Sequence, residues 1–358
     1  MEGLFLIEVK NLTKKYGKTT AVDNISFNIE KGKIYGFLGP NGAGKSTTMN
    51  IITGCISATS GSVAINGHDM VTDSIAAKSL IGYLPEIPPL YPDMTPYEYL
   101  MFVAMAKGMD KLSASMQIRD VITLTSLEEV KDRLICNLSK GFRQRVGIAQ
   151  AMLGSPEIII LDEPTVGLDP KQIIEIRELI RRLGQMKTII LSSHILAEIA
   201  TLCDHVIIIH KGRLVANDTI DNLEGKMDNT QKLFLTVKGE TKAVAKALAP
   251  IESIIEISQI PSESEKIIEL ELEILKDKNA EEDIFFALAK INTPIVRMTP
   301  HQPSLEDIFL SLTDETDFDD DENEIDFIPR ENESEKASEE EEYKPLFSTK
   351  TKDEEDDK

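Results

Sequence analysis

Nine residues near the amino terminus have the types and spacing of a phosphate-binding loop. Segment 39–47 reads G-P-N-G-A-G-K-S-T, which fits the pattern G-x-x-x-x-G-K-[ST]. Glycines let backbone N–H groups turn toward phosphates, and a following helix adds partial positive charge. Lys45 can reach the β- and γ-phosphates of a nucleotide, and the Ser46 hydroxyl can bind Mg²⁺. The predicted phosphate contacts are Gly39, Pro40, Asn41, Gly42, Ala43, Gly44, Lys45, Ser46 and Thr47.

Such a loop requires a strand before it and a helix after it, and the flanking sequence supplies both. Residues 34–38 form a short apolar run typical of a buried strand, and residues 45–53 can form a helix that ends at Gly54. The alternative at this point is a glycine-rich turn that binds no nucleotide.

A second group of reactive side chains follows another apolar run. Residues 158–161 are I-I-I-L, and Asp162 and Glu163 come directly after them. This is the form of a buried parallel strand with acidic groups at its carboxyl end. Asp162 is placed to hold Mg²⁺ or its water, and Glu163 could take a proton from an attacking water, which is worth roughly 10²–10⁴-fold in rate. A Mg²⁺ site without hydrolysis, or a helix cap before Pro164, is the alternative.

The elements that must position these groups read as an α/β domain. Closely spaced strands at 4–9, 25–29 and 34–38 predict an antiparallel β-layer beside the phosphate loop. Apolar spacing at 97–107, 114–124 and 126–131 predicts helices, so that about 88–153 reads as a helical subdomain. Buried strands at 188–191 and 206–210 close this first domain, which we assign to 1–216.

A second region, 217–312, shows a different order of elements. The pattern predicts strand, helix, strand, strand, helix and strand, which is the order of a ferredoxin-like α+β domain. A closing helix is predicted at 304–312, with Ser304 as its N-cap. The remaining residues, 313–358, are acidic and poor in apolar side chains, and we expect them to be disordered.

Composition limits the class of protein. The chain has 358 residues and a net charge of −22, and 313–358 alone contain 21 acidic and 6 basic residues. The remainder is mildly acidic and has no long basic cluster, so nucleic-acid binding is not expected. The three cysteines are far apart, which favours reduced thiols. We find no signal peptide and no apolar run near the roughly 20 residues that span a bilayer.

Taken together, these motifs resemble those of the ATP-binding subunits of ATP-binding cassette (ABC) transporters. The resemblance covers residues 4 to about 215: the phosphate loop, the strand I-I-I-L-D-E-P, the segment L-S-K-G-F-R-Q-R-V at 138–146 and G-L-D-P at 167–170 follow the family's order. Within the resemblance, Tyr16 matches the ring that stacks on adenine, Asp169 belongs to the D-loop and His194 is the switch histidine that contacts the γ-phosphate. Each residue alone has a simpler interpretation: a surface tyrosine, a helix cap or a buried histidine.

The resemblance implies an ATPase that is completed by a second copy of itself. It implies a RecA-like parallel sheet with the antiparallel β-layer and helical subdomain, ATP and Mg²⁺ as cofactors, and a head-to-tail dimer in which Ser139 and Gly141 reach the γ-phosphate of the partner. Lys45, Glu163 and His194 would be the catalytic residues. A separate transmembrane permease would hold the subunit at the inner face of the cell membrane, in the cytoplasm.

The sequence departs from the family pattern at two motifs. Glu86 stands where the family has the Q-loop glutamine; its carboxylate can still approach Mg²⁺ but adds a negative charge. Lys140 and Phe142 replace a glycine and the glutamine of the signature. These variants resemble the ATPases of ABC-2 type exporters, as does the region after 215. Export is expected on that ground alone, and the sequence does not identify the cargo.

Two other functions remain open at this stage. A soluble ABC ATPase that acts on nucleic acid or ribosomes is one alternative, although such proteins usually have two cassettes, a long coiled-coil insertion or basic arms. A nucleotide-binding regulator that never hydrolyses ATP is the other.

Overall fold

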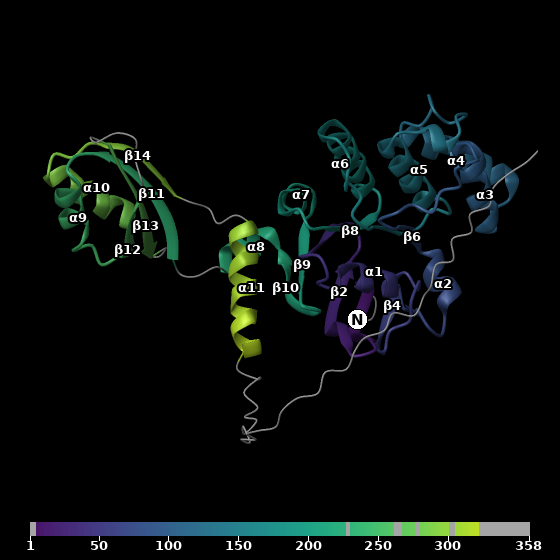
Figure 1. Ribbon diagram of the computed structural model, residues 1–358, viewed down its shortest axis with the longest axis horizontal. Coiled ribbons are helices and arrows are strands. Elements are labelled where there is room, and N and C mark those ends of the chain that lie inside the picture. Colours follow the sequence, from purple (N-terminus) through teal and green to yellow (C-terminus); the bar gives the residue numbers. More distant parts are fainter. Residues whose placement is uncertain (1–4, 227–229, 261–266, 276–278, 301–304, 322–358) are drawn as a thin grey trace, which may run out of the picture. The chain divides into compact units, whose positions relative to one another are not determined.

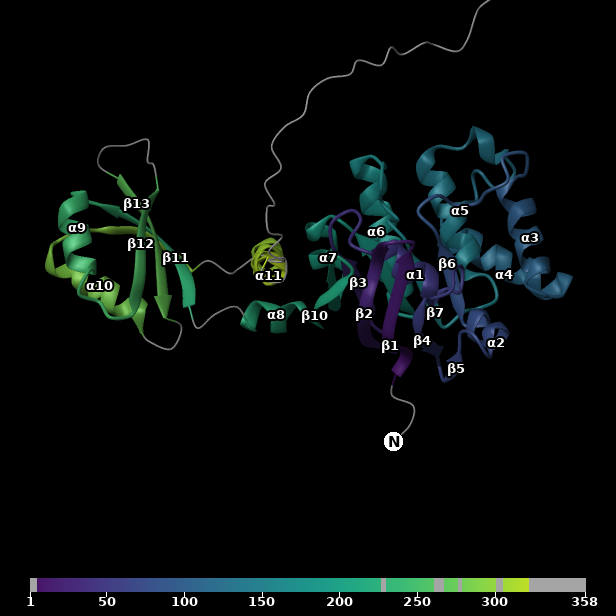
Figure 2. The ribbon, with the colours of Figure 1, turned by 60° about the horizontal axis from the view of Figure 1, so that its bottom comes forward.

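A computed structural model describes residues 5–226, 230–260, 267–275, 279–300 and 305–321 (Figures 1 and 2). Three sheets and the helices that cover them make up most of these residues. No helix in the described ranges combines the length and the apolar character needed to cross a membrane.

The sheet that carries the phosphate loop has six strands in the order β10-β9-β3-β8-β7-β6. They are β3 (Ile34–Leu38), β6 (Ile81–Leu84), β7 (Ile158–Leu161), β8 (Thr188–Ser193), β9 (His205–His210) and β10 (Arg213–Thr219). All pairs are parallel except the edge pair β9-β10. Every residue of β3, β7 and β8 is buried, as expected for strands covered on both faces. Parallel pairing brings the carboxyl ends of β3, β7 and β8 to one edge.

The predicted antiparallel β-layer exists, with the strand order β2-β1-β4-β5. The strand at 34–38, which was also expected in this layer, is β3 of the parallel sheet, so that part of the prediction is wrong. It consists of β1 (Phe5–Tyr16), β2 (Thr19–Glu30), β4 (Ser60–Ile65) and β5 (His68–Asp69), with α2 (Ser74–Ser79) beside it. Helix α1 (Lys45–Ile52) buries Met49 and Ile52 in one cluster with residues of both this layer and the parallel sheet. On the other face, α6 (Pro170–Gly184) and α7 (Leu196–Leu202) contribute to a second cluster. The phosphate loop is thus fixed between two packed layers.

The helical subdomain has three α-helices, which Figure 1 shows grouped apart from the β-layer. They are α3 (Pro96–Ala106), α4 (Lys111–Leu124) and α5 (Lys140–Met152), with a short 3₁₀ turn at Ile135–Asn137. Thr95 and Glu98 form a capping box that starts α3. The prediction of a helix at 126–131 is wrong, because these residues form turns and Ser126 has a left-handed φ of 54°. The apolar spacing there reflects Leu127 and Val130, which are buried in the subdomain core.

The second region has the predicted order of elements. It comprises β11 (Thr230–Lys238), α9 (Thr241–Leu248), β12 (Ile254–Ile260), β13 (Ile267–Leu275), α10 (Ala280–Lys290) and β14 (Ile295–Pro300). The sheet order β12-β13-β11-β14 is antiparallel throughout and corresponds to a ferredoxin-like arrangement. Alternate residues of β13 are buried, because the helices cover one face of the sheet. The fold class is therefore confirmed for both parts.

The last helix, α11 (Leu305–Asp321), continues beyond the predicted end at 312. Leu305 and Ile308 are buried in the same cluster as Leu223 of α8 (Ile220–Lys226) and the residues of α6 and α7. The helix therefore packs on the ATPase part, while β11 to β14 lie between α8 and α11 in the chain. Ser304 and residues 322–358 are outside the described ranges. The domain boundaries at 216 and 312 stay predictions; β10 and α11 cross them.

We expect Ile308→Ala to lower the free energy of unfolding by about 2–5 kcal/mol, because it deletes most of a side chain that is 1% exposed. Urea unfolding followed by circular dichroism measures the change. Leu310→Ala on the same helix is the matched control: Leu310 is 52% exposed, and we expect a change within about 0.5 kcal/mol. Equal effects of the two variants would contradict the packing of α11 on the ATPase part.

Candidate functional site

The loop between β3 and α1 has a backbone that suits bound phosphates. Gly44 precedes α1 with φ of 106°, and a Cβ there would lie 2.5 Å from the Ala21 carbonyl oxygen. Only glycine avoids this clash. Pro40 accepts a hydrogen bond from the Ala43 N–H at 3.2 Å, and Ala43 is buried beneath the loop. The first N–H groups of α1 have no acceptors within the helix and are directed to its amino-terminal end.

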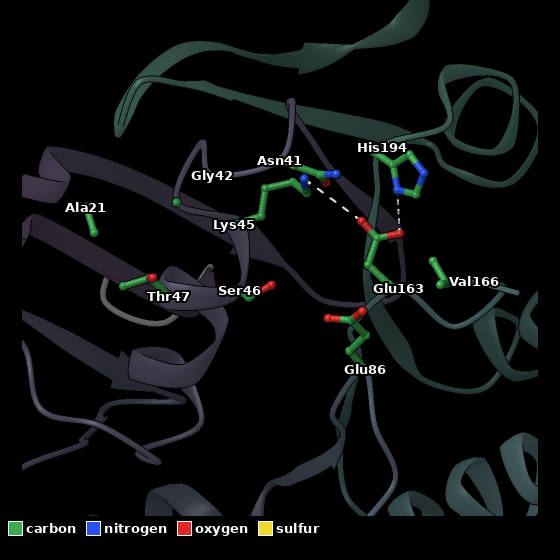
Figure 3. Close-up of a pocket in the computed structure, with 11 residues that line it drawn as sticks. Ala21, Asn41, Gly42, Lys45, Ser46, Thr47, Glu86, Glu163, Val166 and His194 are labelled. Atoms are coloured by element: carbon green, nitrogen blue, oxygen red, sulfur yellow. Dashed lines mark hydrogen bonds and ion pairs between the residues drawn. The ribbon is translucent and has the colours of Figure 1, made fainter. Parts of the chain in front are cut away.

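A cavity of about 380 Å³ opens beside this loop. The cavity is lined by nine of the predicted site residues and by two residues that were not predicted, Ala21 and Val166 (Figure 3). The predicted residues are Asn41, Gly42, Gly44, Lys45, Ser46, Thr47, Glu86, Glu163 and His194. These residues come from four separate parts of the chain: the phosphate loop with α1, and the segments that follow β6, β7 and β8.

The side chain of Lys45 folds back onto the phosphate loop. Its Nζ donates hydrogen bonds to the backbone oxygens of Gly39 at 2.7 Å and Pro40 at 3.2 Å, and lies 3.9 Å from Glu163 Oε1. The side chain is only 6% exposed. Burial lowers the pKa of Lys45, and the carboxylates of Glu163, Asp162 and Glu86 oppose that shift. An anionic phosphate in the cavity would meet this ammonium directly.

Asp162 connects the carboxyl end of β7 with α1 and β8. Its Oδ1 accepts hydrogen bonds from Ser46 Oγ at 3.2 Å and from Ser192 Oγ at 2.6 Å, and the residue is 3% exposed. A hydroxyl and a carboxylate suit Mg²⁺, which binds through one or two carboxylates together with waters and phosphate oxygens. Across the described residues, no three or more His, Cys, Asp or Glu side chains form a metal cluster by themselves. The residues fit a Mg²⁺ ion that arrives with a nucleotide.

Glu163 and His194 both line the cavity and contact each other. His194 Nδ1 lies 2.9 Å from Glu163 Oε2, and the Glu163 N–H donates to Ser192 Oγ at 2.8 Å (Figure 3). Glu163 is 9% exposed and has φ of 48°, a left-handed conformation that a non-glycine residue adopts at an energetic cost. The strained backbone aims the carboxylate at the cavity between Lys45 and His194. Two groups able to accept a proton thus lie beside the phosphate loop.

Glu86 approaches the cavity from the segment that follows β6. Figure 3 shows its carboxylate directed into the space between Ser46 and Glu163. Its charge is one of the three that raise the pKa of Lys45 against the effect of burial. A glutamine would line the cavity without that charge.

Eight predicted residues do not line the cavity: Tyr16, Gly39, Pro40, Ala43, Asp162, Ser139, Gly141 and Asp169. Three of them, Ser139, Gly141 and Asp169, are expected to act in the site of a second copy. Ser139 is the N-cap of α5, where its Oγ accepts from the Phe142 N–H at 3.3 Å, and Asp169 caps α6 through the Gln172 N–H at 2.9 Å. Gly141 lies in the first turn of α5, against the side chain of Gln172. Their contact with a nucleotide held by a second copy stays a prediction.

Tyr16 is at the end of β1 and is also absent from the cavity lining. Its ring is 51% exposed and lies 5.0 Å from Lys14 Nζ. An exposed ring can stack on a base, so its role as an adenine platform stays a prediction.

Sequence reasoning missed Ser192, which binds both acidic residues of the site. Its buried hydroxyl donates to Asp162 and accepts from the Glu163 N–H. A usable signal was present, because a hydroxyl pair, Ser192 and Ser193, ends a buried strand next to β7. The carboxyl ends of adjacent parallel strands meet at one edge, where such groups come together.

Comparisons with known proteins agree with this geometry. A sequence family described as "ABC transporter" matches residues 22–166. The chain is 33% identical over 316 residues to the linearmycin resistance ATP-binding protein LnrL of Bacillus subtilis, covering 87% of this chain and 99% of the relative. It is 41% identical over 241 residues to the bacitracin transport ATP-binding protein BcrA of Bacillus licheniformis, covering 67% and 77% respectively.

Solved structures give the same result for the fold. One is a dimeric ATP-binding cassette in a post-hydrolysis state, bound to ADP and phosphate. It matches with a TM-score of 0.54 and 28% identity, over 60% of this chain and 98% of its own. The agreement concerns the ATPase part.

Proposed function

Because this chain belongs to the ABC transporter family as an ATP-binding subunit with ATPase activity, we propose that it powers a separate membrane permease through an ATP-dependent dimer. The observation that carries the proposal is the meeting of Lys45, Glu163 and His194 around one cavity beside the phosphate loop, where Ser46 also lines the cavity and donates a hydrogen bond to the buried Asp162. Binding, metal coordination and proton transfer are then available within a single site.

In this proposal the phosphate loop and Lys45 bind the β- and γ-phosphates of ATP. Ser46 and Asp162 would hold Mg²⁺, with Glu86 nearby, and the bound ion would neutralise charge on the phosphates. Glu163 accepts a proton from the attacking water, and the 2.9 Å contact with His194 orients its carboxylate. His194, which is 42% exposed in this chain, can turn toward the γ-phosphate.

A second copy of the chain supplies the other wall of the site. Ser139 and Gly141 lie at the amino-terminal end of α5, where unpaired N–H groups and partial positive charge favour a phosphate. Neither residue reaches the cavity of its own chain, which supports contact across a head-to-tail dimer. ATP would hold the two copies together, and its hydrolysis would release them.

The permease would bind the helical subdomain. Tyr91 and Phe102 are 48% and 46% exposed with their ring centroids 5.4 Å apart. A groove of about 500 Å³ that includes Ile87 and Lys140 also contains Glu86 of the nucleotide cavity. A permease helix in this groove would contact Glu86, which also lines the nucleotide cavity, so nucleotide binding and permease contact would be coupled through this residue. Membrane association would follow from this contact, and the names of the relatives, bacitracin transport and linearmycin resistance, support export.

We expect Asp162→Asn to lower Mg²⁺-dependent ATP hydrolysis by more than about 10²-fold, since loss of even an outer-shell partner of a metal costs roughly 10–100-fold. Phosphate release over a Mg²⁺ titration measures the effect. Asp73→Asn, a neutralisation at an exposed residue paired with His68, is the control and should leave the rate unchanged. An unchanged Mg²⁺ dependence in Asp162→Asn would remove Asp162 from the metal site.

The permease is tested by purifying the full chain from detergent-solubilised membranes. We expect a polytopic membrane protein to co-purify with it and to be lost from the variant Tyr91→Ala/Phe102→Ala. Co-purification of ribosomes or nucleic acid in its place would contradict the proposal.

A further inference from the structure

A buried carboxylate, Glu198, is not among the residues that line the cavity, and none of its hydrogen bonds is to a group proposed to touch ATP. Its Oε2 accepts hydrogen bonds from Thr165 Oγ1 at 2.8 Å and from Ser193 Oγ at 2.9 Å. Its Oε1 accepts from Arg177 Nη2 at 3.1 Å. Glu198 is 1% exposed, and Thr165 and Ser193 are also buried.

The two hydroxyls belong to the two segments that carry the proposed catalytic groups. Thr165 is two residues after Glu163, and Ser193 directly precedes His194. Thr165 lies in the segment after β7 and Ser193 is the last residue of β8, so the two are about thirty residues apart in the chain and are brought together by the pairing of β7 with β8. Glu163 and His194 meet at 2.9 Å, and the hydrogen bonds of Thr165 and Ser193 to Glu198 join the same two segments a second time.

Ser193 also fixes the start of α7, which carries Glu198. Its Oγ accepts the Ile195 N–H at 3.0 Å while it donates to Glu198. Arg177 of α6 completes the set and supplies the positive charge that a buried carboxylate requires. Every partner of Glu198 is a donor, so an ionised carboxylate satisfies all three at once.

We propose that Glu198 is a positioning residue, which holds Glu163 and His194 at the separation needed for water activation. This inference rests on the proposed roles of Glu163 and His194. A displacement of about 1 Å in a catalytic group can cost roughly 10²-fold in rate, and hydrogen bonds from a buried second layer prevent such displacements. The carboxylate acts through the two loops and does not touch the nucleotide.

The test uses Glu198→Gln in the full-length chain. The amide keeps the size of the side chain, but its NH₂ group cannot accept from Arg177 or from a hydroxyl. We expect kcat for ATP to fall about 10–100-fold and KM to change by less than about threefold, because the phosphate loop is untouched. Thr165→Val and Ser193→Ala remove one hydroxyl each, keep the Arg177 ion pair and should give smaller losses of kcat.

In the double variant Glu198→Gln/Thr165→Val, the fold-decrease in kcat should be smaller than the product of the fold-decreases in the two single variants, because both changes remove the same hydrogen bond. The matched control is Thr125→Val, which removes a hydroxyl that is fully buried in the helical subdomain and bonded to the Val121 carbonyl oxygen. It should lower thermal stability and leave kcat unchanged. If Glu198→Gln does not fold, Thr165→Val and Ser193→Ala decide the question.

The inference is overturned if the Glu198, Thr165 and Ser193 variants keep kcat within about threefold of the unaltered protein. It is also overturned if kcat, KM and stability all decline together, since that pattern describes a general loss of structure. The variant Glu163→Gln distinguishes a failure of this inference from a failure of the proposed function. If Glu163→Gln turns over ATP normally, the proposed catalytic site is refuted. If Glu163→Gln is inactive while Glu198→Gln turns over ATP normally, only the positioning role of Glu198 is refuted.

Discussion

Glu163→Gln is expected to reduce ATP hydrolysis by roughly 10²–10⁴-fold while ATP binding persists. The amide has nearly the shape of the carboxylate but cannot accept a proton from water. Lys45 remains in the loop through its bonds to the oxygens of Gly39 and Pro40, which do not depend on Glu163. Because ATP then stays bound, we expect the variant to accumulate as a dimer.

Phosphate release measures the rate, and sedimentation with and without ATP measures the dimer. Glu157→Gln is the matched control: Glu157 directly precedes β7, at the end opposite Glu163, and pairs with Lys31 at 2.8 Å on the surface. It should turn over ATP normally and show no trapped dimer. Near-normal hydrolysis in Glu163→Gln would remove Glu163 from its role as base.

Gly141→Asp is expected to lower turnover by about 10²-fold or more although it leaves the phosphate loop of the same chain intact, comparable to the loss of one donor to a developing anion. In the dimer, an added carboxylate at the start of α5 would face the γ-phosphate held by the partner. Within one chain the new Cβ would lie 2.6 Å from Cδ of Gln172, a flexible side chain that can move. Monomeric ATP binding should therefore be retained.

Mixing two inactive variants tests the shared site directly. Lys45→Ala provides an intact signature helix, and Gly141→Asp provides an intact phosphate loop, so their mixed dimer contains one complete site. We expect the mixture to recover part of the activity that each variant lacks. Ser113→Asp, which adds an acid to the first turn of α4, is the control and should be active alone. Full activity of Gly141→Asp alone, or no recovery when the two inactive variants are mixed, would contradict the composite site.

Much of the site followed from local spacing. The phosphate loop and the pair Asp162 and Glu163 are short motifs in which neighbours along the chain act together. Their chemistry can therefore be predicted from the sequence. The order of strands and helices in the second region was also predicted correctly, because burial imposes a period of two or 3.6 on the sequence. The segment 126–131 shows the limit of this reasoning: Leu127 and Val130 are buried from a turn, which produces the same spacing as a helix.

The sequence by itself determined what this protein binds and which family it resembles, because phosphate binding depends on a contiguous backbone conformation and its flanking residues. Only the tertiary structure decided which distant side chains share partners: Ser192 with Asp162 and Glu163, Glu198 with Thr165 and Ser193, and α11 with the ATPase core. The physical reason is that pairing of β7 with β8 brings segments about thirty residues apart in the chain to one sheet edge. No local pattern encodes which of several buried polar groups will meet there.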